Sequence, residues 1–187
     1  MKEYPYQEDR ENIQELLKQY ERLRRGQGNS FLEEDAFEKI ILYFEDREEL
    51  QKALEAANRA IEQYPYSAAL MIRKAEVLLG CRLYHDALEV LDQAALFDSG
   101  DINLYILRTD AYLALDQQEK AAQQLQDALD QFEGEERLEL LFELSDVYDD
   151  YEEFDKVFDC LKMILEQDPK QRRGFIQNLF LDRFYRS

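Results

Sequence analysis

The sequence predicts an all-α protein built as an array of antiparallel helix pairs, and three observations predict it. Apolar residues recur at helical spacing along most of the chain. Alanines recur at a fixed period in its middle part. Only 6 Gly and 3 Pro among 187 residues leave little sequence for long irregular loops. Residues 68–101 show the plan: two apolar helical patterns flank a break at residues 80–82, and neither pattern can bury its apolar stripe without neighbouring helices.

The first predicted helix covers residues 8–25 and is amphipathic. Its apolar residues share one face at helical spacing, namely Ile13, Leu16, Leu17, Tyr20 and Leu23. The Gly-containing stretch 26–30 ends it. We expect residues 1–33 to form an N-terminal capping helix and linker, because a repeat array needs its exposed ends covered. A helix that binds a partner or forms a dimer is the alternative.

The second helix of each predicted pair carries the period. Apolar residues return every 34 positions, and after residue 121 the spacing becomes 36. The resulting columns are Ala53, Ala87, Ala121 and Val157; Ala57, Leu91, Leu125 and Leu161; and Ala60, Ala94, Ala128 and Ile164. Within one helix these residues are four and three positions apart, which puts them on one face. The two extra residues fall at residues 133–136, an acidic stretch that we expect to be a loop, since loops tolerate insertion.

The first helix of each predicted pair has its own columns. A large residue opens it, a mostly small residue follows four positions later, and another large residue comes three positions after that. These columns are Phe37, Met71, Tyr105 and Leu141; Ile41, Ala75, Thr109 and Ser145; and Phe44, Leu78, Tyr112 and Tyr148. Pro65 and Pro169 end two of the pairs, because proline cannot continue the hydrogen-bond ladder of a helix. The predicted repeats are residues 34–67, 68–101, 102–137 and 138–171.

This pattern resembles the tetratricopeptide repeat (TPR). The shared marks are the period of 34, the spacing of small and large residues on the second helix, and the proline that ends a unit. The resemblance covers four copies, residues 34–171, and departs from the family at Ile41, Val157 and Ile164, which stand where small residues are usual. It implies a right-handed superhelical array, a TPR-like α-solenoid, whose first helices line a concave groove for a peptide or helix of a partner protein.

Two neighbouring columns of the first helices are candidate groove residues under this resemblance. One column is apolar in its last three copies, and the next, four residues on along the same helix face, is acidic in those copies. The candidates are Glu38, Ile72, Glu76, Ile106, Asp110, Phe142 and Asp146. They suit a partner with apolar anchors and Lys or Arg. The alternative is that they are ordinary solvated positions in a chain whose residues are 35% charged.

The same columns argue against one known kind of TPR ligand. Some TPR proteins hold the terminal carboxylate of a chaperone tail with Lys, Asn and Arg in these columns. Those side chains are missing here, and the acidic residues that replace them would repel a carboxylate. A chaperone C-terminal tail is therefore not an expected partner.

Residues 172–187 form a predicted C-terminal helix rich in aromatic residues. Phe175, Ile176, Leu179, Phe180 and Phe184 give it an apolar face too large for a helix that only faces solvent. The face could cap the last repeat, or be covered by a further repeat of a longer chain. It could also associate with a second copy through Phe175, Leu179, Phe180 and Phe184, which would make the protein a structural module and a homo-oligomer.

The net charge of −19 narrows the range of partners. An acidic protein repels nucleic-acid phosphates and anionic membrane surfaces, so we expect neither as a partner. The sequence has no apolar run of membrane-spanning length and no apolar leader, which makes the cytoplasm the expected compartment. The two cysteines, Cys81 and Cys160, form no pair motif.

Catalysis, a metal site and a cofactor find no support in the sequence. The single histidine, His85, belongs to no cluster with metal-ligand spacing, and no Gly-rich phosphate-binding loop follows a strand. Residues 146–159 are dense in acidic and aromatic residues but lack the pattern of a calcium loop. We expect them to form the turn inside the fourth pair, with Tyr148, Tyr151 and Phe154 packed inward. The sequence therefore predicts a non-catalytic protein-interaction scaffold.

Overall fold

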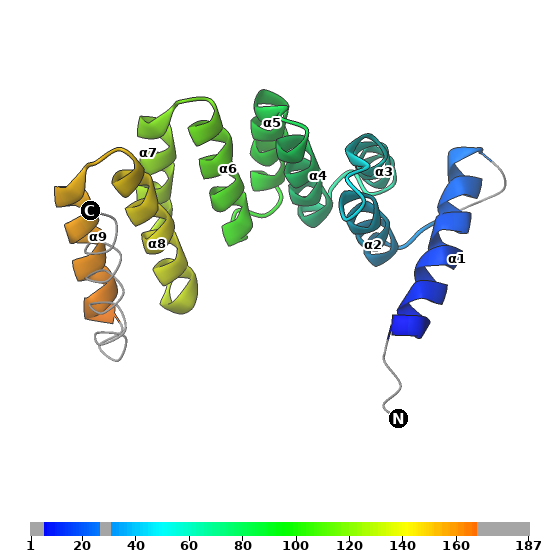
Figure 1. Ribbon diagram of the computed structural model, residues 1–187, viewed down its shortest axis with the longest axis horizontal. Helices are drawn as coiled ribbons and strands as arrows, with labels where there is room; N and C mark the ends of the chain where they lie inside the picture. The colour runs from blue at the N-terminus through cyan, green and yellow to red at the C-terminus, as the bar shows by residue number, and fades with distance from the viewer. Residues whose placement is uncertain (1–5, 27–30, 168–187) are drawn as a thin grey trace. The chain divides into compact units, whose positions relative to one another are not determined.

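The structure is a computed structural model that describes residues 6–26 and 31–167, with side chains described for residues 13–26 and 31–166. Within these residues it is all-α and contains nine helices, as the sequence predicts (Figure 1). The helices are α1 (Tyr6–Arg24), α2 (Glu34–Glu45), α3 (Leu50–Gln63), α4 (Ala68–Gly80), α5 (Tyr84–Ala95), α6 (Ile102–Ala114), α7 (Gln118–Ala128), α8 (Gly134–Asp150) and α9 (Phe154–Gln167). The chain divides into two compact units, unit 1 (Met1–Ser99) and unit 2 (Gly100–Ser187).

Consecutive helices pack as antiparallel pairs. Unit 1 holds the pairs α2–α3 and α4–α5, with α1 against α2 and α3 against α4. Unit 2 holds the pairs α6–α7 and α8–α9, with α7 against α8. The first helices of neighbouring pairs also meet, α2 with α4 and α6 with α8. Helices such as α3 and α7 therefore bury apolar surface against two neighbours, as their stripes require.

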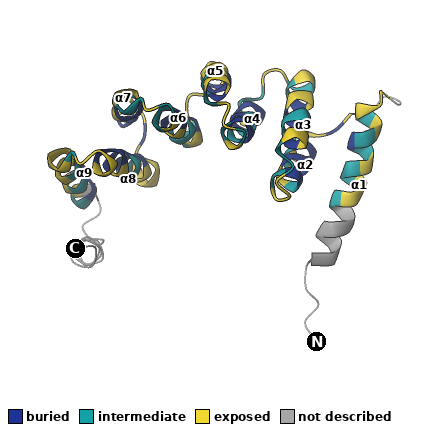
Figure 2. Cartoon of the chain, turned by 45° about the horizontal axis from the view of Figure 1, so that its top comes forward, coloured by how far each residue is buried: buried dark blue, intermediate teal, exposed yellow. Residues whose placement is uncertain are grey.

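The alanine columns of the second helices are fully enclosed. Every member of these columns from Ala53 to Ala128 is 0% exposed, which confirms the predicted period. Figure 2 colours the buried residues of the helices dark blue. Small side chains at these positions let the helix axes approach closely. In α9 the same columns are less enclosed: Ile164 is 1% exposed, whereas Val157 and Leu161 are partly exposed.

Each helix pair is closed by the same main-chain turn. One residue of each turn adopts the left-handed conformation, with φ between 56° and 60°, namely Glu48, Arg82, Asp116 and Glu152. The following amide donates to the carbonyl oxygen five residues earlier, as Glu49 does to Phe44 at 2.9 Å, which is the Schellman arrangement. The break that the sequence places at residues 80–82 is such a turn, although Gly80 itself still belongs to α4.

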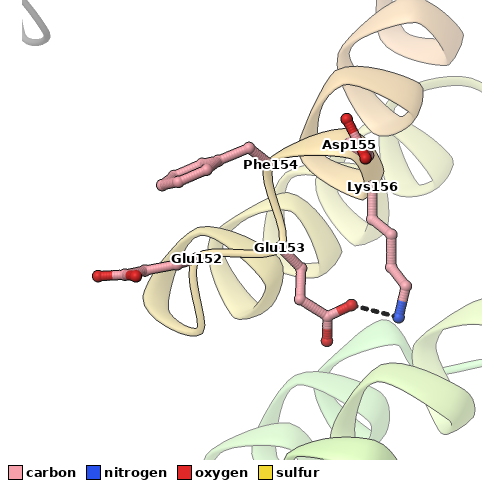
Figure 3. A pocket seen from close by; sticks show the side chains of 5 residues that line it. All are labelled: Glu152, Glu153, Phe154, Asp155 and Lys156. Atoms are coloured by element: carbon pink, nitrogen blue, oxygen red, sulfur yellow. Dashed lines mark ion pairs between the residues drawn. The ribbon is translucent and has the colours of Figure 1, made fainter.

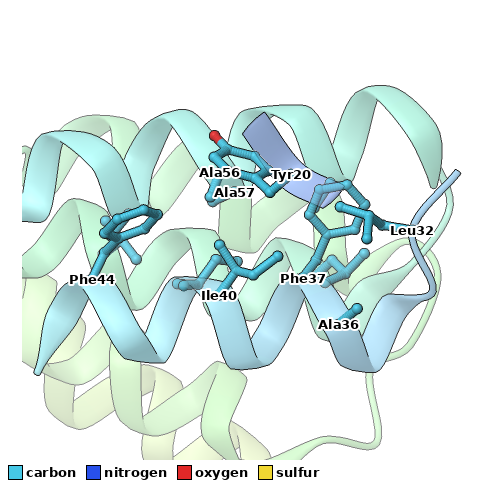
Figure 4. Packing of buried hydrophobic residues seen from close by; sticks show 13 residues of the cluster. Tyr20, Leu32, Ala36, Phe37, Ile40, Phe44, Ala56 and Ala57 are labelled. Carbon is cyan, nitrogen blue, oxygen red and sulfur yellow. The ribbon is translucent and has the colours of Figure 1, made fainter. Parts of the chain in front are cut away.

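The core of unit 1 joins α1 to the first helix pair (Figure 4). Tyr20 of α1 is 2% exposed, and its ring meets the Phe44 ring edge-on at a centroid distance of 6.3 Å. Phe37 of α2 is 0% exposed and meets the Tyr64 ring edge-on at 6.4 Å. The Tyr64 hydroxyl donates to the carbonyl oxygen of Leu32 at 2.8 Å. Aromatic packing therefore holds α1, α2 and the end of α3 together.

Helix α8 begins earlier than the sequence predicts. The insertion at residues 133–136 predicts a loop, but α8 starts at Gly134. Gly134 has a φ of 60°, which glycine adopts without steric conflict. Glu135 and Glu136 lie in the first turn, where the helix dipole favours negative charge. The extra residues thus lengthen α8 at its N-terminal end, and the prediction of a loop is wrong.

The acidic and aromatic stretch 146–159 is a helix–turn–helix, but only one of its three aromatic residues packs inward. Tyr148 is 3% exposed, whereas Tyr151 is 38% and Phe154 is 48% exposed. The prediction of inward packing is therefore wrong for Tyr151 and Phe154. The reason is their place: Tyr151 lies in the turn and Phe154 is the first residue of α9, so neither lies on the face that α8 and α9 share.

Unit 2 buries polar side chains where unit 1 buries apolar ones. The Thr109 hydroxyl, in a residue that is 1% exposed, donates to the carbonyl oxygen of Tyr105 at 3.0 Å. Nε2 of Gln124 in α7 donates to the same carbonyl at 2.8 Å and to Oγ1 of Thr109 at 2.5 Å. The corresponding residues of the second repeat are Ala75 and Val90. Hydrogen bonds therefore join α6 to α7 at positions where α4 and α5 have apolar side chains.

The predicted C-terminal helix, residues 172–187, lies outside the described residues, and so do Phe175, Leu179, Phe180 and Phe184. Among the helices that the structure does describe, none is both long enough and apolar enough to cross a membrane.

Candidate interaction faces

The candidate groove residues all lie on the first helices of the pairs: Glu38 on α2, Ile72 and Glu76 on α4, Ile106 and Asp110 on α6, and Phe142 and Asp146 on α8. Since α2 contacts α4 and α6 contacts α8, each unit carries candidates on two contacting helices. We call Glu38, Ile72 and Glu76 the α2/α4 face, and Ile106, Asp110, Phe142 and Asp146 the α6/α8 face.

The acidic charge of the α2/α4 face is partly balanced by an arginine. Arg73 forms an ion pair with Glu76 one turn further along α4, and both side chains are 28% exposed. Burial raises the pKa of Glu45 on α2, Arg73 acts to lower that pKa, and Glu76 acts to raise it. One positive and two negative groups therefore interact across α2 and α4, which reduces the attraction of this face for a basic ligand.

The apolar part of the α2/α4 face is mostly closed. Ile72 is 5% exposed, so little of its side chain is available to a ligand. Leu42 of α2 is 42% exposed and stands in the column that holds Asp110 and Asp146 in unit 2. The first repeat therefore presents a leucine where the other three repeats have a carboxylate.

Three carboxylates gather on the two helices of the α6/α8 face. Burial raises the pKa of Asp110. Burial also raises the pKa of Glu143 on α8, and Asp110 and Asp146 raise it further. The pKa of Asp146 is raised by burial and then by Asp150 and Asp149. Within the described part of the chain, no ion pair joins Asp110, Glu143 or Asp146 to a basic side chain. A cationic group placed here would relieve this repulsion.

Apolar side chains adjoin these carboxylates. Ile106 and Phe142 stand one helical turn before Asp110 and Asp146, on the same helix face. Both are half-buried, so part of each side chain reaches the surface. The α6/α8 face therefore combines the two chemistries that a ligand with apolar anchors and basic residues needs.

Two surface hollows lie away from these faces. One, of about 340 Å³, is lined by Glu152, Glu153, Phe154, Asp155 and Lys156 in the turn between α8 and α9 (Figure 3). In Figure 3 the Glu153 carboxylate and the Lys156 ammonium lie close together, and the ion pair between them measures 2.5 Å. The other hollow, of about 370 Å³, lies on unit 1 between Leu54, Lys74 and Asp86. Across the described ranges, no group of three or more His, Cys, Asp or Glu side chains could hold a metal ion.

Three features do not follow from the sequence columns. Arg73 and Glu143 each lie one position after a column residue, and the spacing of Arg73 to Glu76 was the available signal for their ion pair. The third feature is an exposed aromatic pair in unit 1: Tyr66 and Phe97 are 75% and 48% exposed, and their rings meet edge-on at 5.6 Å. Both follow second helices, so a comparison of the connections between repeats could have found them.

Comparison with known proteins gives structural matches alone. No family model matches the chain, and none of the curated proteins matches it. The MamA fragment 41-end from Desulfovibrio magneticus RS-1 matches with a TM-score of 0.63 at 20% identity, over 87% of this chain and 94% of that one. TTC0263, a thermophilic TPR protein of Thermus thermophilus, matches with a TM-score of 0.61 at 19% identity, over 87% of this chain and 86% of that one.

A TPR domain bound to a peptide also matches. The first TPR of Spaghetti (RPAP3), bound to the HSP90 peptide SRMEEVD, has a TM-score of 0.54 at 15% identity, over 63% of this chain and 92% of that one. Identities this low show a common fold rather than a common activity. Together with the period of 34, the enclosed alanine columns and the repeated turn, these matches show that the chain has the tetratricopeptide-repeat fold.

Proposed function

We propose that this protein is a non-catalytic interaction module that binds a peptide or helix of a partner protein on the first helices of its repeats. The TPR fold is in general a scaffold for protein interactions, and the matched RPAP3 domain holds a peptide. The observation that carries the proposal for this chain is the α6/α8 face. There, partly exposed Ile106 and Phe142 adjoin carboxylates that have no described cationic partner.

The chemistry of this face defines the partner. Apolar side chains of the ligand would contact Ile106 and Phe142, and a Lys or Arg one helical turn away would lie near Asp110 and Asp146. The peptide SRMEEVD, which the RPAP3 domain binds, carries acidic residues at its end. Like charges would oppose such a tail on the α6/α8 face, so the proposed partner is basic and apolar rather than an acidic chaperone tail.

Binding of two synthetic peptides to the full chain tests this proposal. The first is a helical peptide with Leu or Phe anchors, each followed four residues later by Lys, and the second is SRMEEVD. Fluorescence anisotropy should show that the basic peptide binds, that its Kd rises with salt, and that SRMEEVD does not bind. The double variant Asp110→Lys with Asp146→Lys should raise the Kd of the basic peptide by about ten- to a hundredfold.

A matched variant separates the face from the net charge. Asp127 and Asp130 are exposed acidic residues at the end of α7 and in the turn after it. Asp127→Lys with Asp130→Lys changes the net charge equally and should leave the Kd within about twofold of wild type. Equal loss in both double variants, or binding of SRMEEVD in place of the basic peptide, would refute the proposed face. Affinity capture from the source cell with mass spectrometry would then supply candidate natural partners.

A further inference from the structure

The outward side of α9 carries an apolar strip formed by Phe158, Leu161 and Leu165, which we call the α9 strip. Phe158 is 68% exposed, and Leu161 and Leu165 are partly exposed. Within the described residues, α9 packs against α8, which leaves the opposite side of the helix open. A strip of this composition on a surface helix indicates a surface that something covers.

The corresponding strip of α7 shows what a covered strip looks like. At the positions 36 residues earlier stand Ala122, Leu125 and Leu129, which are 7%, 0% and 7% exposed. They are enclosed because α8, the next helix of the chain, packs against α7. The α9 strip occupies the same place on its helix and has a phenylalanine where α7 has an alanine. More apolar surface is therefore left to bury on α9 than on α7. Among the described helices, α7 packs against both α6 and α8, whereas α9 packs against α8.

The chain carries a matching segment directly after α9. Residues 172–187 contain apolar residues at helical spacing, namely Phe175, Ile176, Leu179, Phe180 and Phe184. Proline is the second residue after the end of both α3 and α9, Pro65 after Gln63 and Pro169 after Gln167. The proline after α9 thus stands where it does after α3, which leads directly into the helix that packs on it.

The charges of the two surfaces are complementary. The segment carries Arg172, Arg173, Arg183 and Arg186. The exposed charged residues of α9 are three acidic residues, Asp155, Asp159 and Glu166, and two lysines, Lys156 and Lys162. The arginines outnumber the one acidic residue of the segment, Asp182, while acidic residues outnumber lysines by one on α9, so the net charges have opposite signs and favour docking.

We propose that residues 172–187 pack as a helix on the α9 strip of the same chain, in the place that α8 takes on α7. The phenylalanines of the segment then lie inside a monomer and are not available to a second copy. The α9 strip shares no residue with the α6/α8 face, so this inference and the proposed peptide binding succeed or fail separately.

Hydrogen exchange of the full chain tests the contact from the α9 side. In the wild type the amides of residues 172–187 should exchange slowly. Phe158→Glu places a charge in the strip and should speed their exchange by about tenfold or more. The matched control is Leu96→Glu in unit 1, where Leu96 is 81% exposed, and it should leave the exchange of residues 172–187 unchanged.

A second variant tests the contact from the other side. Phe180→Glu should release the segment as Phe158→Glu does, while the exchange of α6 to α8 stays as in the wild type. Sedimentation velocity over a wide concentration range should report a monomer throughout. Fast exchange of residues 172–187 in the wild type would overturn the proposal. A dimer whose dissociation on dilution exposes the segment would overturn it as well, because it would place the segment on a second copy.

Discussion

The amide of Glu49 donates to the carbonyl oxygen of Phe44 at 2.9 Å, and this bond closes the first helix pair around Glu48, whose φ is 58°. The other pairs have the same bond, from Leu83 to Leu78, from Gln117 to Tyr112 and from Glu153 to Tyr148. The left-handed residue is never glycine, although this conformation costs other residues about 1–2 kcal/mol. Main-chain hydrogen bonds therefore define the turn, and each turn residue is held in a strained conformation.

Glycine at the left-handed positions should stabilise the protein. Arg82→Gly in unit 1 and Asp116→Gly in unit 2 should each raise the free energy of unfolding by about 0.5–1 kcal/mol, because glycine adopts a positive φ without steric conflict. The control is Glu89→Gly on the exposed side of α5, which should lower it by about 1 kcal/mol. Urea denaturation measures all three. Loss of stability in the two turn variants would show that these residues are not strained.

Substitutions in the enclosed columns should lower the free energy of unfolding far more than the same substitutions at exposed positions. Leu91→Ala removes a side chain that is 0% exposed, and the cavity should lower the free energy of unfolding by about 2–5 kcal/mol. Leu96→Ala removes the same side chain where it is 81% exposed and should change that free energy by less than about 0.5 kcal/mol. Thermal unfolding monitored by circular dichroism compares the two variants. Similar losses at both positions would contradict the assignment of Leu91 to the core.

The buried hydrogen bonds between α6 and α7 should depend on both partners. Gln124→Ala removes the donor to the Thr109 hydroxyl and to the Tyr105 carbonyl, and should lower the free energy of unfolding by about 1–3 kcal/mol. The double variant Thr109→Ala with Gln124→Val copies the residues of the second repeat. It should recover most of that loss, because it leaves no side-chain polar group unpaired at these two positions. Thr109→Ala, Gln124→Val and their double variant form the double-mutant cycle, in which additive losses would argue against the coupling.

The carboxylates near the α6/α8 face should oppose folding at neutral pH. The pKa values of Asp110, Glu143 and Asp146 are raised above the ordinary 3.8 of Asp and 4.5 of Glu, so the folded state disfavours the charged forms. This penalty is complete above the raised pKa values. It falls as the native state takes up protons with decreasing pH, and it is gone below the ordinary values.

The triple variant Asp110→Asn, Glu143→Gln and Asp146→Asn should therefore be more stable than the wild type at neutral pH. The difference should shrink as the pH falls and vanish below the ordinary pKa values of the carboxyls. Thermal unfolding across this range measures it, and the triple variant Glu89→Gln, Asp127→Asn and Asp130→Asn, at exposed positions, controls for the equal change in net charge. A triple variant that is less stable than the wild type at neutral pH would show that the carboxylates support the fold.

The helix pairs and their enclosed columns could be predicted because the same packing demand recurs in each repeat. Ala53, Ala87 and Ala121 repeat in the sequence because each occupies the same position on a second helix that packs closely on its partner. The turns could not be located to the residue, since the strained position holds Glu, Arg or Asp, and only Asp is enriched in the left-handed conformation. The start of α8 was missed because an insertion in the sequence does not say whether a loop or a helix takes up the extra residues.

The sequence predicts which residues form the α2/α4 and α6/α8 faces, but it does not predict which of their carboxylates are paired with a basic side chain. The sequence columns predict Asp110 and Asp146 as candidate residues, but they also place Glu76 in an equivalent position. Glu76 differs because Arg73 of the same helix pairs with it, and the column alone does not show the neighbour. Glu143 joins the acidic group through the contact of α6 with α8, and a residue's surroundings across two helices are not visible in the periodicity of one.

Because main-chain groups close in sequence form each turn, the turns affect both the rate of folding and the way in which the array can gain repeats during evolution. Each pair can form from contacts that are close in sequence, and proteins rich in such contacts fold quickly. Pulled from its two ends, the molecule should lengthen in steps of about one helix pair, because neighbouring pairs are the cooperative elements of such arrays. Duplicating one pair in the gene would bring a working turn with it, whatever side chain stands at its tip.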